Sequence, residues 1–140
     1  MVASRHAIGY IAVMMHVLLV FLGGGIGATG RYLVGIAALR QFGPGFPYGT
    51  LMVNLVGSLL MGLFIGWLVR KGGSHELRLF FATGVLGGFT TYSAFSLDVA
   101  NLWEQGNLGA ALIYTMGTVV ACVAAVFVGL WFARSISAWG

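Results

Sequence analysis

The sequence predicts an all-α membrane protein, a single domain over residues 1–140 in which four helices cross the bilayer. Three observations predict this class: 59% of the residues are hydrophobic, only 7% are charged, and the mean hydropathy is +0.97. A soluble domain carries about 25% charged residues, and a disordered chain combines low hydrophobicity with high net charge. Both of these classes are therefore excluded.

Four segments are long and apolar enough to cross a bilayer, whose hydrocarbon core needs about 20 helical residues. The expected helices span residues 11–31, 48–69, 77–103 and 108–132. The first is too long for the apolar region of a signal peptide and runs into a glycine-rich stretch that ends at Arg31, so we expect it to stay in the membrane. Residues 1–13 can be an N-terminal extension, because a start at Met14 or Met15 would still give a complete first span.

Turn-forming residues separate the expected helices. Residues 43–47 hold both prolines of the chain, residues 70–74 hold a basic pair followed by two glycines, and residues 104–107 hold a glycine and an asparagine. Ser74 is a candidate N-cap for the third helix, because its hydroxyl can accept a hydrogen bond from a first-turn amide. None of these connections is long enough for a solvent-exposed domain, so we expect the protein to act inside the bilayer.

The third helix is predicted to be broken near its centre. Residues 84–96 contain the pair Gly87–Gly88 followed by Thr90 and Thr91, and each glycine in a helix costs about 1 kcal/mol relative to alanine. Unwound backbone at membrane depth persists only where it is buried in protein or lines a cavity. Because broken helices build ion sites in transporters, we expect this interruption to be functional.

Glycine and other small residues recur at spacings that indicate close helix packing. Small residues four positions apart share one helix face and let two backbones approach each other in lipid. Such positions are Gly23 and Gly27 in the first helix, Ser58, Gly62 and Gly66 in the second, and Gly117, Ala121, Ala125 and Gly129 in the fourth. We interpret the glycines as packing positions.

Two helices carry a polar stripe at a spacing of four residues. The second helix presents Thr50, Asn54 and Ser58, and the fourth presents Tyr114, Thr118 and Cys122. Polar residues inside a membrane usually face the protein interior or water. A hydroxyl can instead bond to its own helix, whereas the Asn54 amide has two donor hydrogens and a carbonyl that its helix cannot satisfy.

The basic residues are distributed unevenly between the two sides of the membrane. With four crossings, the two termini and the middle connection share one side, which holds Arg5, Arg70, Lys71, Arg78 and Arg134, against Arg31 and Arg40 on the other. The positive-inside rule therefore favours cytoplasmic termini. The preference is weaker if Arg5 belongs to an extension that is not translated and Arg78 lies within the third helix.

Several sequence features are absent, and their absence disfavours further classes of function. No basic run is longer than Arg70–Lys71, so we expect no nucleic-acid partner, and the single Cys122 excludes a multi-cysteine metal site. The sequence contains no serine-hydrolase or zinc-protease motif, so we expect no enzyme. The acidic residues Glu76, Asp98 and Glu104 are expected to flank the spans, whereas a proton-coupled carrier usually needs a carboxylate within the membrane.

Three sequence blocks resemble the small bacterial fluoride channels of the Fluc or CrcB-like family. The blocks are residues 23–32, 49–58 and 84–95, within a similarity over residues 18–133. The third block is the most specific, because it combines paired glycines, paired threonines and spaced aromatics. The resemblance implies an antiparallel homodimer among the lipids of the bacterial inner membrane, with two fluoride pores along the subunit interface and a structural sodium ion at its centre.

The resemblance also implies roles for individual residues. The expected fluoride pore comprises Asn54, Tyr92, Phe95, Thr50, Tyr114, Thr118, Cys122 and Arg31. Backbone oxygens of Gly87 and Thr90 are expected to hold sodium, and Asp98 is the acidic residue that follows the pore aromatics. Tyr92 stands where the family commonly has phenylalanine, and Cys122 stands where it often has serine, which is a stronger hydrogen-bond donor.

The expected pore residues suit a small, strongly hydrated anion. An amide, hydroxyls and the positive edges of aromatic rings offer distributed contacts, and each contact must be weak enough for the ion to leave. A membrane potential that is negative inside favours anion exit by about 2.3 kcal/mol per 100 mV, so we expect passive fluoride efflux. One alternative is a dual-topology, proton-coupled exporter of small molecules or drugs, but the lack of a mid-span carboxylate disfavours it. A second is a packing subunit of a larger complex, but this function would leave both polar stripes unexplained.

Overall fold

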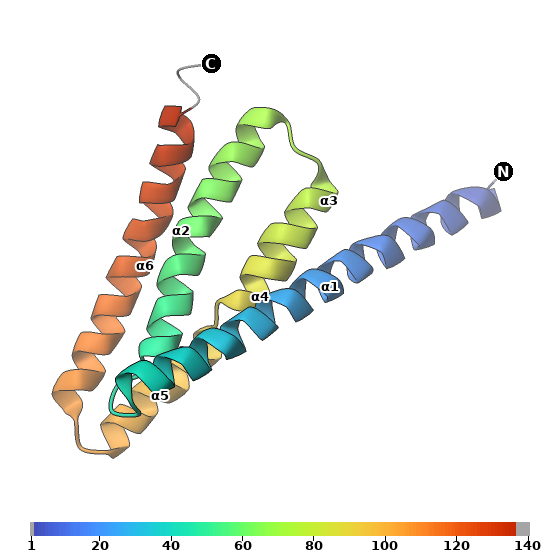
Figure 1. Ribbon diagram of the computed structural model, residues 1–140. Helices are drawn as coiled ribbons and strands as arrows, with labels where there is room; N and C mark the ends of the chain where they lie inside the picture. Colours follow the sequence, from blue (N-terminus) through green and yellow to red (C-terminus); the bar gives the residue numbers. More distant parts are fainter. Residues whose placement is uncertain (1, 137–140) are drawn as a thin grey trace.

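The computed structural model describes the backbone of residues 2–136 and the side chains of residues 10–135. Within this part of the chain every regular element is helical (Figure 1). Three long helices, α1 (Val2–Phe42), α2 (Tyr48–Lys71) and α6 (Leu108–Ile136), have the length and apolar composition needed to cross a membrane. The chain between α2 and α6 is divided into α3 (His75–Leu77), the π-helix η1 (Arg78–Leu86), α4 (Gly87–Phe89) and α5 (Tyr92–Glu104).

The second and fourth predicted helices are confirmed, and the first is longer than predicted. α1 continues past Arg31 to Phe42, because residues 32–39 are apolar and the first proline of the chain is Pro44. The Arg31 guanidinium reaches the Thr90 carbonyl inside the molecule. Gly43 follows α1 with a φ of +76°, a left-handed conformation that glycine adopts at little cost. Met1, the first residue of the expected extension, lies outside the described residues, whereas residues 2–13 are continuous with α1.

The third segment begins as predicted and then departs from regular α-helix. The Ser74 hydroxyl accepts a hydrogen bond from the Leu77 amide at 3.3 Å, which confirms Ser74 as an N-cap. The chain then enters η1, a π-helix of nine residues that the sequence did not predict. π-Helical turns are rare and often lie near functional sites.

Two pairs of elements pack closely through glycine. α2 lies beside α6, and α1 runs obliquely across η1 and α4 (Figure 1). A Cβ atom added to Gly129 would lie 2.7 Å from the backbone nitrogen of Leu63, and one added to Gly84 would lie 2.9 Å from the Cα of Gly23. The predicted packing role of Gly23 and Gly129 is therefore confirmed, because a side chain at either crossing would push the helices apart.

Contacts between distant segments place the connections at two ends of the molecule. Arg70 Nη1 donates to the Arg134 carbonyl at 2.7 Å, and the rings of His16 and His75 meet edge to face with centroids 5.0 Å apart. These contacts set the connection after α2 beside the C-terminal end of α6 and against α1. The connections after α1 and after α5 lie together at the opposite end, where both line one pocket (Figure 1).

The buried core is small, and much apolar surface is exposed. The core cluster comprises Phe95, Leu102, Ala111 and Tyr114. Large apolar side chains are exposed along the long helices, among them Phe21 at 74% and Ile113 at 73%. Apolar surface of this extent is expected where helices face lipid or another subunit.

Candidate functional site

The third segment contains two residues with extended backbone, Thr90 and Thr91. Thr90 has φ −81° and ψ 159°, and Thr91 has φ −153° and ψ 122°. α4 ends at Phe89 and α5 begins at Tyr92, so the extended pair separates two helices. The Thr91 hydroxyl accepts a hydrogen bond from the Ala94 amide at 3.2 Å and thereby caps α5.

Asn54 of α2 supplies the hydrogen bonds that this extended segment would otherwise lack. Its Nδ2 donates to the Thr91 carbonyl at 2.9 Å, and its Oδ1 accepts from the Thr91 amide at 2.7 Å. Because Thr91 is only 9% exposed, one side chain replaces water as the partner of both of its backbone groups. We call this arrangement the Asn54–Thr91 clamp.

The clamp removes the usual hydrogen-bond donor of the Gly87 carbonyl, which lies one turn before Thr91. In a continuous α-helix the Thr91 amide would donate to the Gly87 carbonyl, four residues before it. Here that amide donates to Asn54. The Gly87 oxygen therefore loses its normal helical partner, and a carbonyl oxygen is a ligand that hard cations accept.

Arg31 reaches the same segment from α1. Its Nη1 donates to the Thr90 carbonyl at 3.3 Å, and its side chain is half-buried. A guanidinium thus contacts the oxygen that was expected to hold sodium. On the α2 side, the Thr90 methyl group fills the space beside Gly57, where an added Cβ atom would collide with it.

A groove of about 270 Å³ lies beside the clamp, between α2, α5 and α6. The predicted site residues that line it are Asn54, Thr90, Tyr92, Phe95, Thr118 and Cys122. The rings of Tyr92 and Phe95 have centroids 5.6 Å apart, and Tyr92 is 78% exposed whereas Phe95 is 6% exposed. Thr118 Oγ1 is buried and has no hydrogen-bond partner among the residues that the structure describes.

Tyr114 lies in the core behind Phe95 and does not line the groove. The two ring centroids are 5.3 Å apart. The Tyr114 hydroxyl donates to Asp98 Oδ2 at 3.2 Å, so its proton is already engaged by a carboxylate. Asp98 itself lies inside α5 rather than beyond the end of a helix, and its half-buried carboxylate accepts this hydrogen bond.

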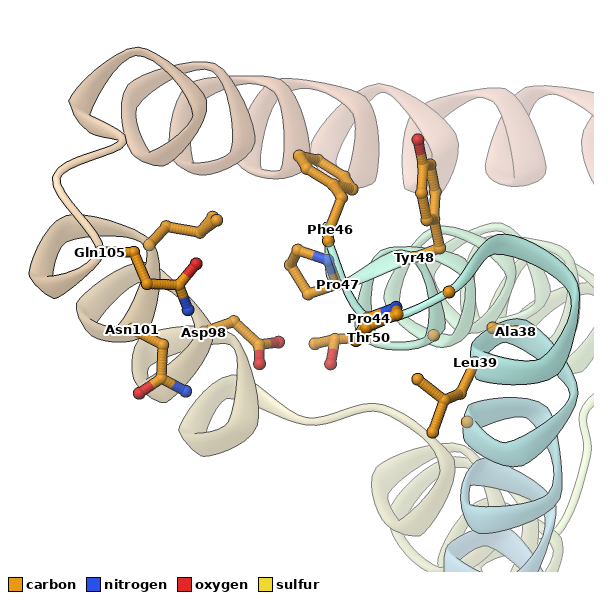
Figure 2. Close-up of a pocket in the computed structure, with 15 residues that line it drawn as sticks. Ala38, Leu39, Pro44, Phe46, Pro47, Tyr48, Thr50, Asp98, Asn101 and Gln105 are labelled. Carbon is orange, nitrogen blue, oxygen red and sulfur yellow. The ribbon is translucent and has the colours of Figure 1, made fainter.

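Thr50 lies in a different cavity, at the end of the molecule that holds the connections after α1 and after α5. This cavity has a volume of about 350 Å³, and Figure 2 shows the Asp98 carboxylate directed toward Thr50 within it. The structure therefore brings six predicted site residues to the groove. It places Thr50 and Tyr114 outside the groove, and Arg31 meets Thr90 from α1.

Sequence reasoning missed the residue at the centre of the site, Thr91. The available signal was a threonine directly before a helical pattern, which is an N-cap signature. Gly57 was missed as well, because no sequence pattern pairs a glycine in one helix with a threonine methyl group in another.

Comparisons with known proteins match most of the chain. The family model described as "CrcB-like protein, Camphor Resistance (CrcB)" matches residues 18–130. A relative from Mesorhizobium japonicum, named Fluoride-specific ion channel FluC, is 55% identical over 123 residues, which cover 88% of this chain and 99% of the relative. Relatives of the same name from Chelativorans sp. and Agrobacterium fabrum are 56% and 50% identical over 124 residues, with the same coverage.

Proposed function

The chain belongs to the CrcB-like family, and from this premise we propose that two antiparallel copies form a fluoride-selective channel with two pores. The names of the relatives support a fluoride channel and not an enzyme. The protein is a multi-pass protein of the bacterial inner membrane. In this setting the channel allows passive fluoride efflux, driven by the membrane potential and the fluoride gradient.

The groove beside the clamp is the proposed fluoride path. The Asn54 amide has two donor hydrogens, and the bond to Thr91 uses one, which leaves the other for an anion. Thr118 adds a hydroxyl that no protein group engages in the described chain. The ring edges of Tyr92 and Phe95 add weaker positive contacts. These donors replace part of the hydration shell without a full positive charge on the path, so the ion can leave.

A second, antiparallel copy is the proposed cover of this groove. Tyr92 lines the groove but is 78% exposed in one copy, which leaves a large amphipathic ring at the surface of the path. A path open to lipid would expose the anion to the hydrocarbon of the bilayer, where burial of an unpaired charge is very costly. A partner subunit that covers Tyr92 removes this cost.

A structural sodium ion between the two copies is the third part of the proposal. The residues present fit such an ion, because the Gly87 carbonyl has lost its usual amide partner to the clamp. The Thr90 carbonyl is the second expected ligand and also accepts from Arg31. When bound, the ion supplies a fixed positive charge that lowers the cost of an anion in a low-dielectric site.

The observation that carries the proposal is the unpartnered Thr118 hydroxyl in a groove that also holds the clamp and both pore aromatics. The test is fluoride efflux from lipid vesicles that contain the purified protein, followed with a fluoride electrode. We expect efflux well above that of empty vesicles, with chloride passing far more slowly. Efflux equal to that of empty vesicles, or equal passage of chloride, contradicts the proposal.

The same vesicles separate the channel from the proton-coupled exporter. Asp98 is a carboxylate that lies inside α5 and lines a cavity, so it is the group that an exporter would use. A passive channel moves fluoride down its gradient when the pH is equal on both sides. An exporter instead requires a proton gradient to move its substrate.

A further inference from the structure

Each group of Thr90 contacts another part of the molecule. Its amide and its hydroxyl both donate to the Leu86 carbonyl at 3.0 Å, and its own carbonyl accepts from Arg31 at 3.3 Å. Its methyl group lies in the space that a Cβ atom of Gly57 would occupy. Thr90 is therefore anchored to η1, to α1 and to α2 at once.

Gly57 lies on the face of α2 that meets the interrupted helix. It is buried and follows Asn54 by three residues, so the two positions share one face, and both line the groove. Asn54 holds the backbone of Thr91 through two hydrogen bonds. Gly57 acts on Thr90 by its lack of a side chain. α2 thus makes two neighbouring contacts with the extended segment, one polar and one steric.

A methyl group at position 57 would take the place of the Thr90 methyl group. Rotation of the Thr90 side chain to another staggered position would remove its hydroxyl from the Leu86 carbonyl. A shift of the Thr90 backbone would instead move its carbonyl away from Arg31. The added atom would also lie 3.3 Å from Phe89 Cδ1, so little space remains beside it. Either movement removes a contact that fixes the Thr90 carbonyl.

We propose that Gly57 is a positioning residue for the Thr90 carbonyl, because it admits the methyl group whose contact with α2 fixes the direction of that carbonyl. The inference rests on the sodium site of the proposed function, in which this oxygen is a ligand. Oxygen ligands bind a hard cation within a narrow range of distances, and a binding site must hold its groups within about 0.5 Å of their productive positions. A small displacement of Thr90 therefore weakens sodium binding even where the fold is retained.

The test measures sodium binding through stability and does not use fluoride transport. An ion that binds only the folded protein raises the thermal unfolding midpoint, by an amount that depends on its concentration relative to its Kd. Unfolding of the purified protein in detergent is followed over a series of Na⁺ concentrations, with N-methylglucamine replacing Na⁺ at constant ionic strength. We expect Gly57→Ala to raise the Na⁺ concentration needed for a given rise by about tenfold or more.

A second substitution moves the methyl group from one side of the contact to the other. Thr90→Ser removes the methyl group and keeps the hydroxyl that bonds to Leu86, so it leaves a small void. By itself it should raise the required Na⁺ concentration by roughly threefold. In the double variant, Gly57→Ala with Thr90→Ser, the new methyl group fills this void. The required Na⁺ concentration should then return to within about twofold of the wild type.

The matched control is Gly66→Ala, on the same helix but away from the extended segment. A Cβ atom added there would lie 2.7 Å from the Cβ of Ala133, so the variant disturbs the contact between α2 and α6. It should lower the unfolding midpoint at every Na⁺ concentration and leave the required Na⁺ concentration unchanged. A role of Gly57 in packing alone would give the same result for Gly57→Ala.

The outcomes separate this inference from the sodium site on which it rests. A wild type whose midpoint does not respond to Na⁺ overturns both. A wild type that responds, with Gly57→Ala either unchanged or not restored by Thr90→Ser, overturns the positioning role alone. If Gly57→Ala does not fold, the comparison of Thr90→Ser with the double variant decides, and a double variant that needs as much Na⁺ as Thr90→Ser overturns the inference.

Discussion

At the scale of single residues, Asn54 compensates for an interrupted helix. A carboxamide presents a donor and an acceptor with the spacing of a peptide group, so it pairs with the amide and the carbonyl of Thr91 at once. An unpaired backbone group inside a membrane costs several kcal/mol. The asparagine that the sequence marked as a pore residue therefore also has a structural role.

The clamp predicts a stability effect for Asn54→Leu. The substitution leaves two backbone groups of Thr91 without partners, and each such group costs about 1–3 kcal/mol. We expect the free energy of unfolding in detergent to fall by about 2–6 kcal/mol, measured by thermal or denaturant unfolding. The control is Thr29→Ala, which removes an exposed hydroxyl bonded to its own helix at Gly25 and should change stability by less than about 0.5 kcal/mol. Equal stability of Asn54→Leu and the wild type would contradict the clamp.

For a substitution of Thr118 we expect reduced fluoride efflux without a loss of stability. Its buried hydroxyl has no partner in the described chain, so Thr118→Val should leave the protein as stable as the wild type or slightly more stable. Fluoride efflux from vesicles should fall by about tenfold, because the path loses a donor that contacts the ion.

The matched control lies one turn earlier on the same helix. Thr115→Val removes a hydroxyl that bonds to the Ala111 carbonyl at 2.7 Å and does not line the groove. It should leave efflux unchanged. Equal efflux from Thr118→Val and the wild type would remove Thr118 from the path.

At the scale of elements, two glycine crossings hold the helices in pairs. α2 approaches α6 at Gly62 and Gly129, and α1 approaches η1 at Gly23 and Gly84. Close approach positions the site, because α2 carries Asn54 and α6 carries Thr118. A change at a crossing therefore alters the groove as well as the stability.

This packing predicts different outcomes for two glycines of α6. Gly129→Ala places a methyl group 2.7 Å from the Leu63 nitrogen, so we expect it to lower the free energy of unfolding by about 1–3 kcal/mol. Gly117→Ala enters open space in one copy and should be neutral or raise stability by up to about 1 kcal/mol. Thermal unfolding in detergent measures both, and an equal loss for the two variants would mean that the crossing is not tight.

At the scale of the whole molecule, the basic residues gather at one end. Arg70, Lys71, Arg78 and Arg134 belong to the end that holds the connection after α2, whereas Arg40 is near the other. Arg31, which the sequence counted with Arg40, bonds to the Thr90 carbonyl inside the molecule. The positive-inside rule therefore favours a cytoplasmic C-terminus more clearly than the sequence count did.

This charge distribution predicts the outcome of C-terminal reporter fusions. We expect the larger signal from a reporter that works in the cytoplasm. An antiparallel homodimer also requires a measurable signal from a reporter that works outside it. Activity on one side alone would contradict the homodimer and would require an inverted partner of a different sequence.

Composition and spacing by themselves determined that the chain is a membrane protein, where its second and fourth helices run, that Gly23 and Gly129 pack, and which residues are polar within the spans. The spacing also predicted that Gly117 packs, which is wrong within one copy, because a Cβ atom added there would meet open space. These properties depend on local hydrophobicity and helical periodicity, which can be recognised in the amino-acid sequence. Tertiary structure alone decided that Asn54 binds Thr91, that Arg31 turns inward to the Thr90 carbonyl, and that Tyr114 donates to Asp98 while Thr50 faces a separate cavity. Each of these depends on side chains meeting from different helices, and the angles at which helices cross are set by packing in three dimensions.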